Sequence, residues 1–234
     1  HTMGPMVAAG LFLDLLRASP FEAAGLKARL HGSLAFTGVG HATDRATLLG
    51  LAGFSPETYH AAKAEDTLEA MKRTKVVSPE GLGTLSLDPA SDIAFDFGPS
   101  LPGHTNGMIL MATDAQGDVI LQQTYYSIGG GFVVTAEEMA SGVSTGDMDP
   151  YPHEFNTANE LLALCAAQGK SIAQIKRENE LSRRSAAALD RGLAKIWDVM
   201  NECINRGLER GGILPGGLNV KRRAKPIHEA LVAE

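Results

Sequence analysis

Cysteine, aromatic residues and long apolar runs are all scarce in this chain. Its 234 residues include two cysteines and one tryptophan, and aromatic residues make up 6% of the total. So few cysteines argue against a disulfide-stabilised secreted scaffold and favour a reducing, cytoplasmic compartment. The longest apolar runs, such as residues 107–112, fall far short of the roughly 18 residues of a membrane span. The sequence shows no charged segment followed by an apolar one, so a secretory signal is not indicated.

A large excess of charge of one sign is also missing. The formal net charge is −6, and the one basic cluster is the short run Lys221, Arg222 and Arg223. These features argue against nucleic acid and against a membrane surface as partners. Hydrophobic residues make up 44% and charged residues 21%, as in ordinary globular proteins.

The first part of the chain, residues 1–150, is predicted to be an α+β domain. Apolar residues at helical spacing predict a helix over residues 5–17, and alternation predicts a strand over 26–36. Two helices are expected over residues 42–53 and 55–73. Short apolar stretches between turn residues then predict a mainly antiparallel sheet, with strands at 83–87, 92–97, 107–113, 119–126 and 131–135.

The second part, residues 151–234, is predicted to be all-α and incomplete. A polar stretch broken by Pro150 and Pro152 forms the expected linker. Thr157 and Ser171 are candidate helix caps, and Gly169 is a candidate helix stop. A longer helix follows, with an apolar stripe at steps of three and four, namely Leu189, Leu193, Trp197, Met200, Ile204 and Leu208.

Three stretches combine glycine with polar side chains, as close approach to a ligand requires. In "GSLAFTGVGHATD", two glycines precede His41, Thr43 and Asp44 at a predicted helix N-terminus, which can attract an anion. The alternative for this stretch is a tight strand-to-helix connection in which His41 only caps or packs.

The other two stretches lie beside predicted strands. "LPGHTNGM" places Asn106 just before a strand, although an ordinary turn uses the same residue types. "TYYSIGGGFV" places Ser127 beside three glycines, Gly129, Gly130 and Gly131, which can form an anion-binding nest of N–H groups. A wide hairpin turn or bulge is the equally weighted alternative.

Metal and cofactor signals are weak in the residues themselves. Cys165 and Cys203 show no ligand spacing, so we expect both to be buried thiols. No lysine has the setting of a pyridoxal Schiff base.

Six stretches taken together resemble one family in their order and spacing. They are "HTMGPM", "GSLAFTGVGHATDRATLLGLAG", "LPGHTNGM", "TYYSIGGGF", "NELLALC" and "CINRGLERGGILPGGLNVKRRA". The chain resembles the iron–sulfur L-serine dehydratases, or L-serine ammonia-lyases, essentially from end to end. The resemblance implies that residues 1–150 are the β domain, similar to the allosteric substrate-binding domain of some phosphoglycerate dehydrogenases. Residues 151–234 would be the start of the helical α domain.

The resemblance also implies a reaction. These enzymes convert L-serine to pyruvate and ammonia with a 4Fe-4S cluster held by three cysteines, whose fourth iron acts as a Lewis acid on the leaving hydroxide. It implies His41 as the base that removes the Cα proton, with Thr43 and Asp44 orienting the base or the substrate. The residues expected to hold the carboxylate or ammonium group are Asn106, Ser127, Gly129, Gly130 and Gly131.

One departure from the family is large. The cluster cysteines of the family lie further toward the C-terminus than Glu234, so no metal ligand is expected in this chain. A non-catalytic serine-binding regulatory module is therefore the alternative function. By analogy with the family we expect a homodimer.

The opening "HTMGPM" could be the remnant of a cloning vector or part of a native motif. The family reads Ser-Ser-Ser-His-Thr, then an apolar residue, then Gly-Pro-Met, and a vector remnant would not continue in this way. His1 and Thr2 are therefore expected to belong to a substrate-binding loop that the ligand orders. This interpretation predicts that both residues reach the pocket of His41, Asn106 and Ser127.

Overall fold

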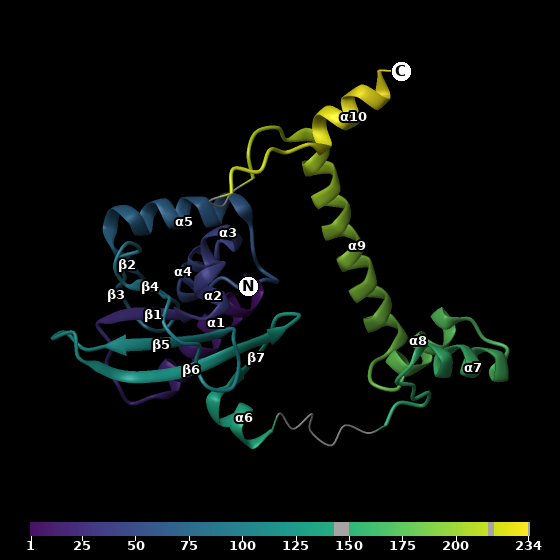
Figure 1. Ribbon diagram of the computed structural model, residues 1–234, viewed down its shortest axis with the longest axis horizontal. Helices are drawn as coiled ribbons and strands as arrows, with labels where there is room; N and C mark the ends of the chain where they lie inside the picture. Colours follow the sequence, from purple (N-terminus) through teal and green to yellow (C-terminus); the bar gives the residue numbers. More distant parts are fainter. Residues whose placement is uncertain (143–149, 215–217, 234) are drawn as a thin grey trace. The chain divides into compact units, whose positions relative to one another are not determined.

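The computed structural model describes residues 1–142, 150–214 and 218–233. Contacts divide the described residues into two compact units, one of 1–142 with 218–219 and one of 150–214 with 220–233. The first unit contains a β-sheet with helices, and the second is helical (Figure 1).

A mixed sheet runs through the first unit in the order β2-β3-β1-β5-β6-β7, and β4 pairs with β1 beside this path. β1 is parallel to β3 and β4, whereas the pairs β1–β5, β2–β3, β5–β6 and β6–β7 are antiparallel. The prediction of a mainly antiparallel sheet is therefore confirmed. The bounds are β1 Gly25–His31, β2 Val76–Val77, β3 Leu85–Ser86, β4 Ile93–Asp96, β5 Gly107–Thr113, β6 Val119–Gly129 and β7 Phe132–Thr135.

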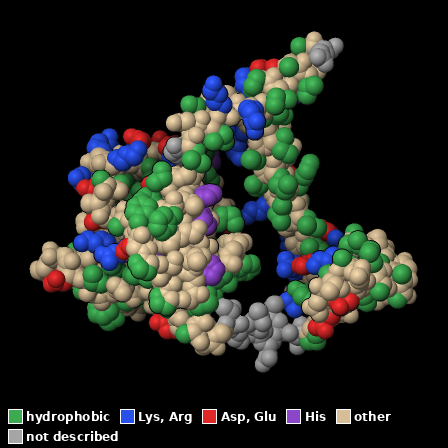
Figure 2. Space-filling model, viewed as in Figure 1, with side chains coloured by type: hydrophobic (Ala, Val, Ile, Leu, Met, Phe, Trp, Pro, Cys, Tyr) green, Lys and Arg blue, Asp and Glu red, His purple; other side chains and the backbone are tan. Residues whose placement is uncertain are grey.

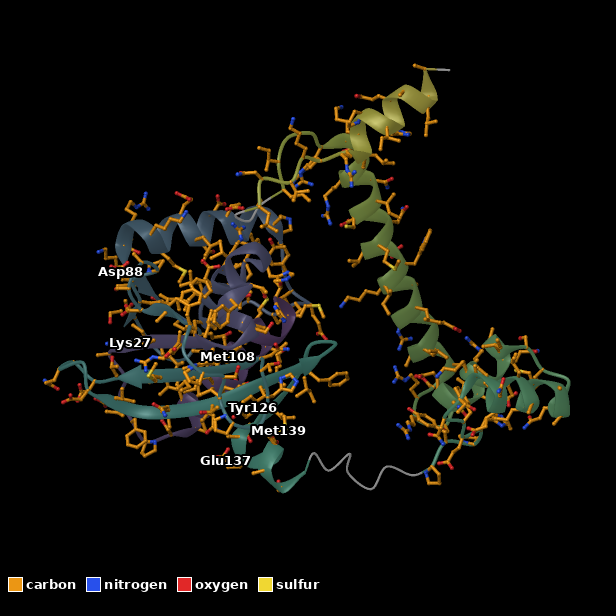
Figure 3. All side chains as sticks on the ribbon, viewed as in Figure 1. Lys27, Asp88, Met108, Tyr126, Glu137 and Met139 are labelled. Atoms are coloured by element: carbon orange, nitrogen blue, oxygen red, sulfur yellow. The ribbon has the colours of Figure 1, made fainter. Side chains whose placement is uncertain are left out.

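One face of the sheet is covered by helices. Along β1, Leu26, Ala28 and Leu30 are buried while Arg29 is exposed, because successive strand residues point to opposite faces. Met108 of β5 is also fully buried in the core, and Figure 3 labels it together with Lys27 of β1. The helix α1 (Met3–Ala18) packs on β5, β6 and β7, α4 (Thr43–Leu51) packs on α1, and α5 (Ala61–Thr74) packs on α4.

The contact between α1 and α4 is unusually close at Gly50. A Cβ atom added there would lie 2.6 Å from the Ala9 Cβ and 2.6 Å from the Met6 carbonyl oxygen. Because backbone atoms occupy this space, only glycine lets the two helices approach so closely. This contact holds the N-terminal turn of α1 in place.

Several predicted elements differ from those observed. The strand expected over 26–36 ends at His31, because Gly32 takes φ 54° and the chain turns into α2 (Ser33–Phe36). The stretch "TGVGH", where the sequence predicts a glycine-rich turn before the next helix, contains the short helix α3 (Gly38–His41). The expected linker begins with α6 (Ala136–Ser141), and Thr135 and Glu138 form a capping box at the start of this helix. The rest of that linker includes residues 143–149, which lie outside the described residues.

The second unit contains α7 (Ala158–Gln168), α8 (Ile172–Leu181), α9 (Ala186–Glu209) and α10 (Ala224–Val232). Thr157 and Ser171 each form a capping box at the start of α7 and α8, and Gly169 ends α7 in the left-handed conformation. These predicted caps and the predicted stop are confirmed. They satisfy backbone groups that helix ends leave unpaired.

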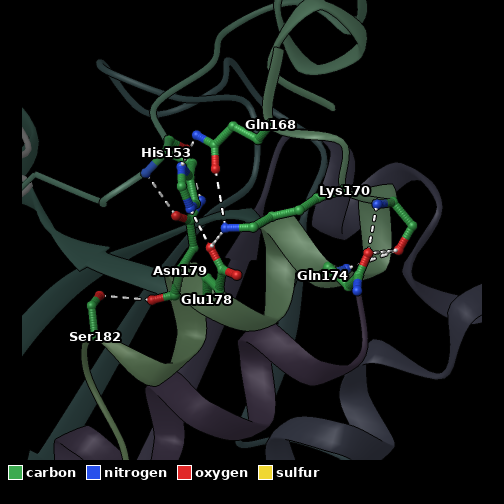
Figure 4. Close-up of polar contacts among 8 residues, drawn as sticks. His153, Gln168, Lys170, Gln174, Glu178, Asn179 and Ser182 are labelled. Atoms are coloured by element: carbon green, nitrogen blue, oxygen red, sulfur yellow. Dashed lines mark hydrogen bonds and ion pairs between the residues drawn. The ribbon is translucent and has the colours of Figure 1, made fainter. Parts of the chain in front are cut away.

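A network of hydrogen bonds joins His153 to α8 (Figure 4). The buried Asn179 side chain accepts from the His153 N–H at 2.9 Å and donates to the His153 carbonyl at 2.8 Å. Lys170 donates to the Gln168 Oε1 at 3.1 Å, so the amide nitrogen of Gln168 faces the His153 Nδ1, also at 3.1 Å. Since an amide nitrogen only donates, the imidazole proton must lie on Nε2, which is 2.6 Å from the Glu178 carboxylate.

The apolar stripe of α9 is exposed along its middle, as the green side chains along this helix in Figure 2 illustrate. Leu189 at its start is buried and Leu208 at its end is half-buried, whereas the residues between them are exposed, namely Leu193, Trp197, Met200 and Ile204. Cys203 on this helix is exposed and Cys165 on α7 is half-buried. The prediction that both are buried thiols is therefore wrong, because burial of a helical stripe requires a partner surface that helical periodicity alone does not guarantee. None of the described helices combines the length and the apolar character that crossing a membrane requires.

Candidate ligand-binding site

A cavity of about 310 Å³ lies where the N-terminus of α1 meets the β6–β7 hairpin. All the residues predicted from the sequence to bind substrate contribute to its lining. Figure 2 shows histidine side chains (purple) gathered at the same edge of the first unit as the N-terminus in Figure 1. The lining residues are His1, Thr2, Met3, Gly4, Asn106, Ser127, Gly129, Gly130 and Gly131.

The glycines of the hairpin have backbone conformations that other residues rarely adopt. Gly129, Gly130 and Gly131 have φ angles of 109°, 61° and 86°, which L side chains disfavour. A register shift between Ser127 and Gly129 marks a bulge just before the turn. The hairpin-and-bulge interpretation is confirmed, and the same glycines line the cavity; their binding of an anion stays a prediction.

Two hydrogen bonds join Asn106, which directly precedes β5, to Ser127 of β6. The Ser127 N–H donates to the Asn106 carbonyl at 3.0 Å, and the Asn106 amide donates to the Ser127 carbonyl at 3.1 Å. Among the described residues, neither the Ser127 hydroxyl nor the Asn106 Oδ1 makes a hydrogen bond. A Cβ at Gly4 would lie 2.0 Å from the Ser127 Oγ, so glycine is needed where α1 passes this hydroxyl.

Hydrogen bonds from α3 and α4 fix the first two residues. The buried Thr43 hydroxyl donates to the His1 carbonyl at 2.9 Å, and the Thr2 hydroxyl donates to the His41 carbonyl at 2.9 Å. Thr37 donates its hydroxyl proton to Ser33, so its oxygen accepts from the His1 Nδ1 at 2.8 Å. In the neutral imidazole, the His1 Nε2 is then the acceptor, and it lies 3.5 Å from the Ser33 hydroxyl.

His41 lies directly beside His1. Their ring centroids are 4.9 Å apart with the planes at 76°, so one hydrogen-bonding ligand could reach both rings. Ala42 takes φ 51°, in the left-handed region, and separates α3 from α4. The structure thus brings His41 next to the cavity, and its role as the base stays a prediction.

Thr43 and Asp44 do not both face this site. Thr43 points to the His1 backbone and therefore supports the N-terminal residues. Asp44 lines a different hollow with Arg45, Leu48 and Lys72. Within the described part of the chain, no hydrogen bond joins Asp44 to His41.

Sequence reasoning did not single out His31, at the end of β1. Its side chain is buried, and its Nε2 has no hydrogen-bond partner among the described residues. Burial lowers the pKa of this imidazole from 6.5 and outweighs Asp96, whose carboxylate 3.7 Å from Nδ1 raises it. A histidine at a strand end carries no local sequence signal for burial, because burial depends on tertiary packing.

Acidification should therefore destabilise the first unit through His31. In the unfolded chain, His31 takes up a proton as the pH falls below 6.5, whereas in the folded chain its pKa is lower. The free energy of unfolding therefore falls as the pH drops from about 6.5 through the lowered pKa of the folded state. His31→Leu should reduce the loss of stability between about pH 7.5 and about pH 5, measured by denaturant unfolding. His60→Leu, at an exposed position, is the control, and an undiminished loss in His31→Leu would contradict this assignment.

The described residues contain no group of three or more His, Cys, Asp or Glu side chains placed to hold a metal ion. An iron–sulfur cluster takes cysteine thiolates as ligands. This chain has two cysteines, one half-buried on α7 and one exposed on α9. These residues do not fit a cluster site by themselves.

A small cavity to which polar side chains and glycines contribute thus lies between the N-terminus of α1 and a glycine hairpin, in an α+β unit. A family model described as the serine dehydratase beta chain matches residues 1–138. The chain belongs to the serine dehydratase β chain family.

Curated relatives match along the whole chain. An L-serine dehydratase of Streptomyces coelicolor is 41% identical over 236 residues, which cover 100% of this chain and 52% of that protein. The L-serine dehydratase TdcG of Escherichia coli is 40% identical, with 100% and 51% covered. An L-serine dehydratase of Helicobacter pylori is 36% identical, with 99% and 50% covered. The chain thus spans about half the length of these relatives.

Proposed function

We propose that this chain forms the substrate-binding part of an L-serine ammonia-lyase, which converts L-serine to pyruvate and ammonia. Residues 1–150 would be the β domain and residues 151–234 the start of the α domain. The observation that carries the proposal is the convergence of His1, Thr2, Asn106, Ser127 and the three hairpin glycines on one cavity. The names of the relatives support the choice of L-serine as the ligand.

The chemistry of the lining fits a zwitterionic amino acid with a hydroxyl group. Glycine-rich turns can present backbone N–H groups to a carboxylate, and the free Asn106 Oδ1 can accept from an ammonium group. The Ser127 hydroxyl can donate or accept. The volume of about 310 Å³ is at the lower end of the roughly 300–1,000 Å³ that is usual for small-molecule sites.

In this proposal His41 takes the proton from the substrate Cα. Its ring is exposed beside His1, and proton transfer requires a base within hydrogen-bonding reach of the proton that it takes. The 4Fe-4S cluster, the homodimer and the cytoplasmic location implied by the family belong to the same proposal. The two cysteines of this chain do not by themselves form the site of that cluster.

Binding by the chain itself is the direct test. L-Serine should bind the purified chain saturably in calorimetry, and Ser127→Ala should raise the Kd about tenfold or more, because a hydrogen bond to a polar ligand is lost. Ser141→Ala, on α6 outside the cavity, is the matched control. Absence of L-serine binding would overturn the proposal.

The regulatory module remains a second candidate, because residues of the first unit alone line the cavity. A measurement of pyruvate formation distinguishes the lyase from the regulatory module. The full-length gene product, purified without oxygen, should form pyruvate from L-serine if it is a lyase. L-Serine binding without pyruvate formation would instead support the regulatory module.

A further inference from the structure

A second cavity, of about 330 Å³, lies against the first turn of α1. Its lining is mainly apolar, and its charged member, Arg45, is held by Glu65 through two hydrogen bonds of 2.5 and 3.1 Å. That pairing compensates the charge, so the cavity offers mainly apolar contacts. The lining residues are Thr2, Met3, Met6, Ala42, Arg45, Ala46, Leu49, Pro56 and Tyr59.

This second cavity, the apolar cavity, shares two lining residues, Thr2 and Met3, with the cavity beside the glycine hairpin. The latter is called the polar cavity because Asn106 and Ser127 contribute to its lining. Thr2 is fixed by its hydrogen bond to the His41 carbonyl. Met3 is 50% exposed, and its unbranched thioether adapts readily to its surroundings. The Met3 Cε lies 3.2 Å from the position that a Cβ of Gly131 would occupy. Met3 is therefore the adaptable part of the wall between the two cavities.

We propose that Met3 determines which substrates fit, by closing the apolar cavity off from the polar cavity. This inference rests on the proposed function. With Met3 in place, the polar cavity accommodates a 2-amino-3-hydroxy acid whose C3 carries only hydrogen, as in L-serine. Shortening Met3 joins the two cavities, and an alkyl or aryl substituent on C3 can then enter the apolar cavity.

The size of the effect follows from the apolar lining. Burial of one methylene is worth about 0.8 kcal/mol, which is about fourfold in affinity. A ligand with two or three additional carbons should therefore gain roughly 15- to 60-fold in Met3→Ala relative to L-serine. L-Serine serves as the internal reference, because its polar contacts are made by other residues of the lining and any general loss of affinity in the variant cancels in the ratio.

The experiment compares Kd values for L-serine, L-threonine, L-threo-3-hydroxynorvaline and L-threo-3-phenylserine by calorimetry. In Met3→Ala the affinity ratio of each longer ligand to L-serine should rise with substituent size, and Met3→Val should give intermediate ratios. Met3→Leu conserves the volume and should behave like the parent chain. If Met3→Ala does not bind L-serine, the ratios in Met3→Val decide.

The Met6 methyl group locates the bound substituent, because Met6 lines the apolar cavity but not the polar one. With ¹³C-methyl methionine labelling, the longer ligands should shift the Met6 signal in Met3→Ala, and L-serine should not. Unchanged affinity ratios, or an unshifted Met6 signal, would overturn the role of Met3 while L-serine binding leaves the proposed function standing. Loss of L-serine binding in the parent chain would overturn both.

Discussion

Replacing His41 by alanine should lower kcat/KM for L-serine by about 10²- to 10⁴-fold, the usual contribution of a general acid–base group. The ring is exposed and contacts the His1 ring edge-on, so its removal leaves the core intact. The His41 carbonyl, which accepts from the Thr2 hydroxyl, is retained in the variant. The loss should therefore appear in catalysis while the fold is preserved.

The measurement is steady-state pyruvate formation by the full-length gene product. His60→Ala is the matched control, since His60 is an exposed histidine at the start of α5, outside the cavity lining. L-Serine binding to His41→Ala, measured by calorimetry, separates lost catalysis from lost affinity. A decrease of less than about tenfold would show that the base is another group.

Replacing Gly50 by alanine should lower the free energy of unfolding of the first unit by about 1–3 kcal/mol, as overpacking does in well-packed cores. The added Cβ meets the Met6 carbonyl oxygen and the Ala9 Cβ, each at 2.6 Å. Neither atom can rotate away, so α1 and α4 must separate. Because the first turn of α1 carries Thr2, Met3 and Gly4 into the cavity, L-serine affinity should fall as well.

Gly10→Ala is the matched control on α1. A Cβ at Gly10 meets no atom within 4 Å, and alanine is the better helix former by roughly 0.8–1.0 kcal/mol. This variant should therefore be unchanged or slightly more stable in denaturant unfolding followed by circular dichroism. Equal stability of Gly50→Ala and the parent chain would show that the two helices can move apart without cost.

Strands and caps could be predicted because their signals are local. β5 occupies the predicted residues 107–113, and Thr157 and Ser171 start their helices as predicted. The end of β1 could not be predicted, since it depends on the positive φ of Gly32 and on the Thr105 carbonyl, which accepts from the Ser33 N–H. That contact joins segments far apart in the chain.

In the candidate site, too, some features could be predicted from the sequence and others depend on tertiary packing. The glycine hairpin and the polar residues beside it are visible as a cluster of residue types, and the family resemblance adds His1 and Thr2. The direction of Asp44 and the burial of His31 depend on which surfaces pack over them. The residues next to Asp44 and His31 in the sequence show no local pattern that would predict this packing.

The exposed stripe of α9 has a consequence for spectroscopy. Trp197 lies in this stripe, is 60% exposed, and is the one tryptophan in the chain. Its fluorescence therefore reports on the surroundings of α9, and a blue shift of the emission would show that a partner surface covers the stripe.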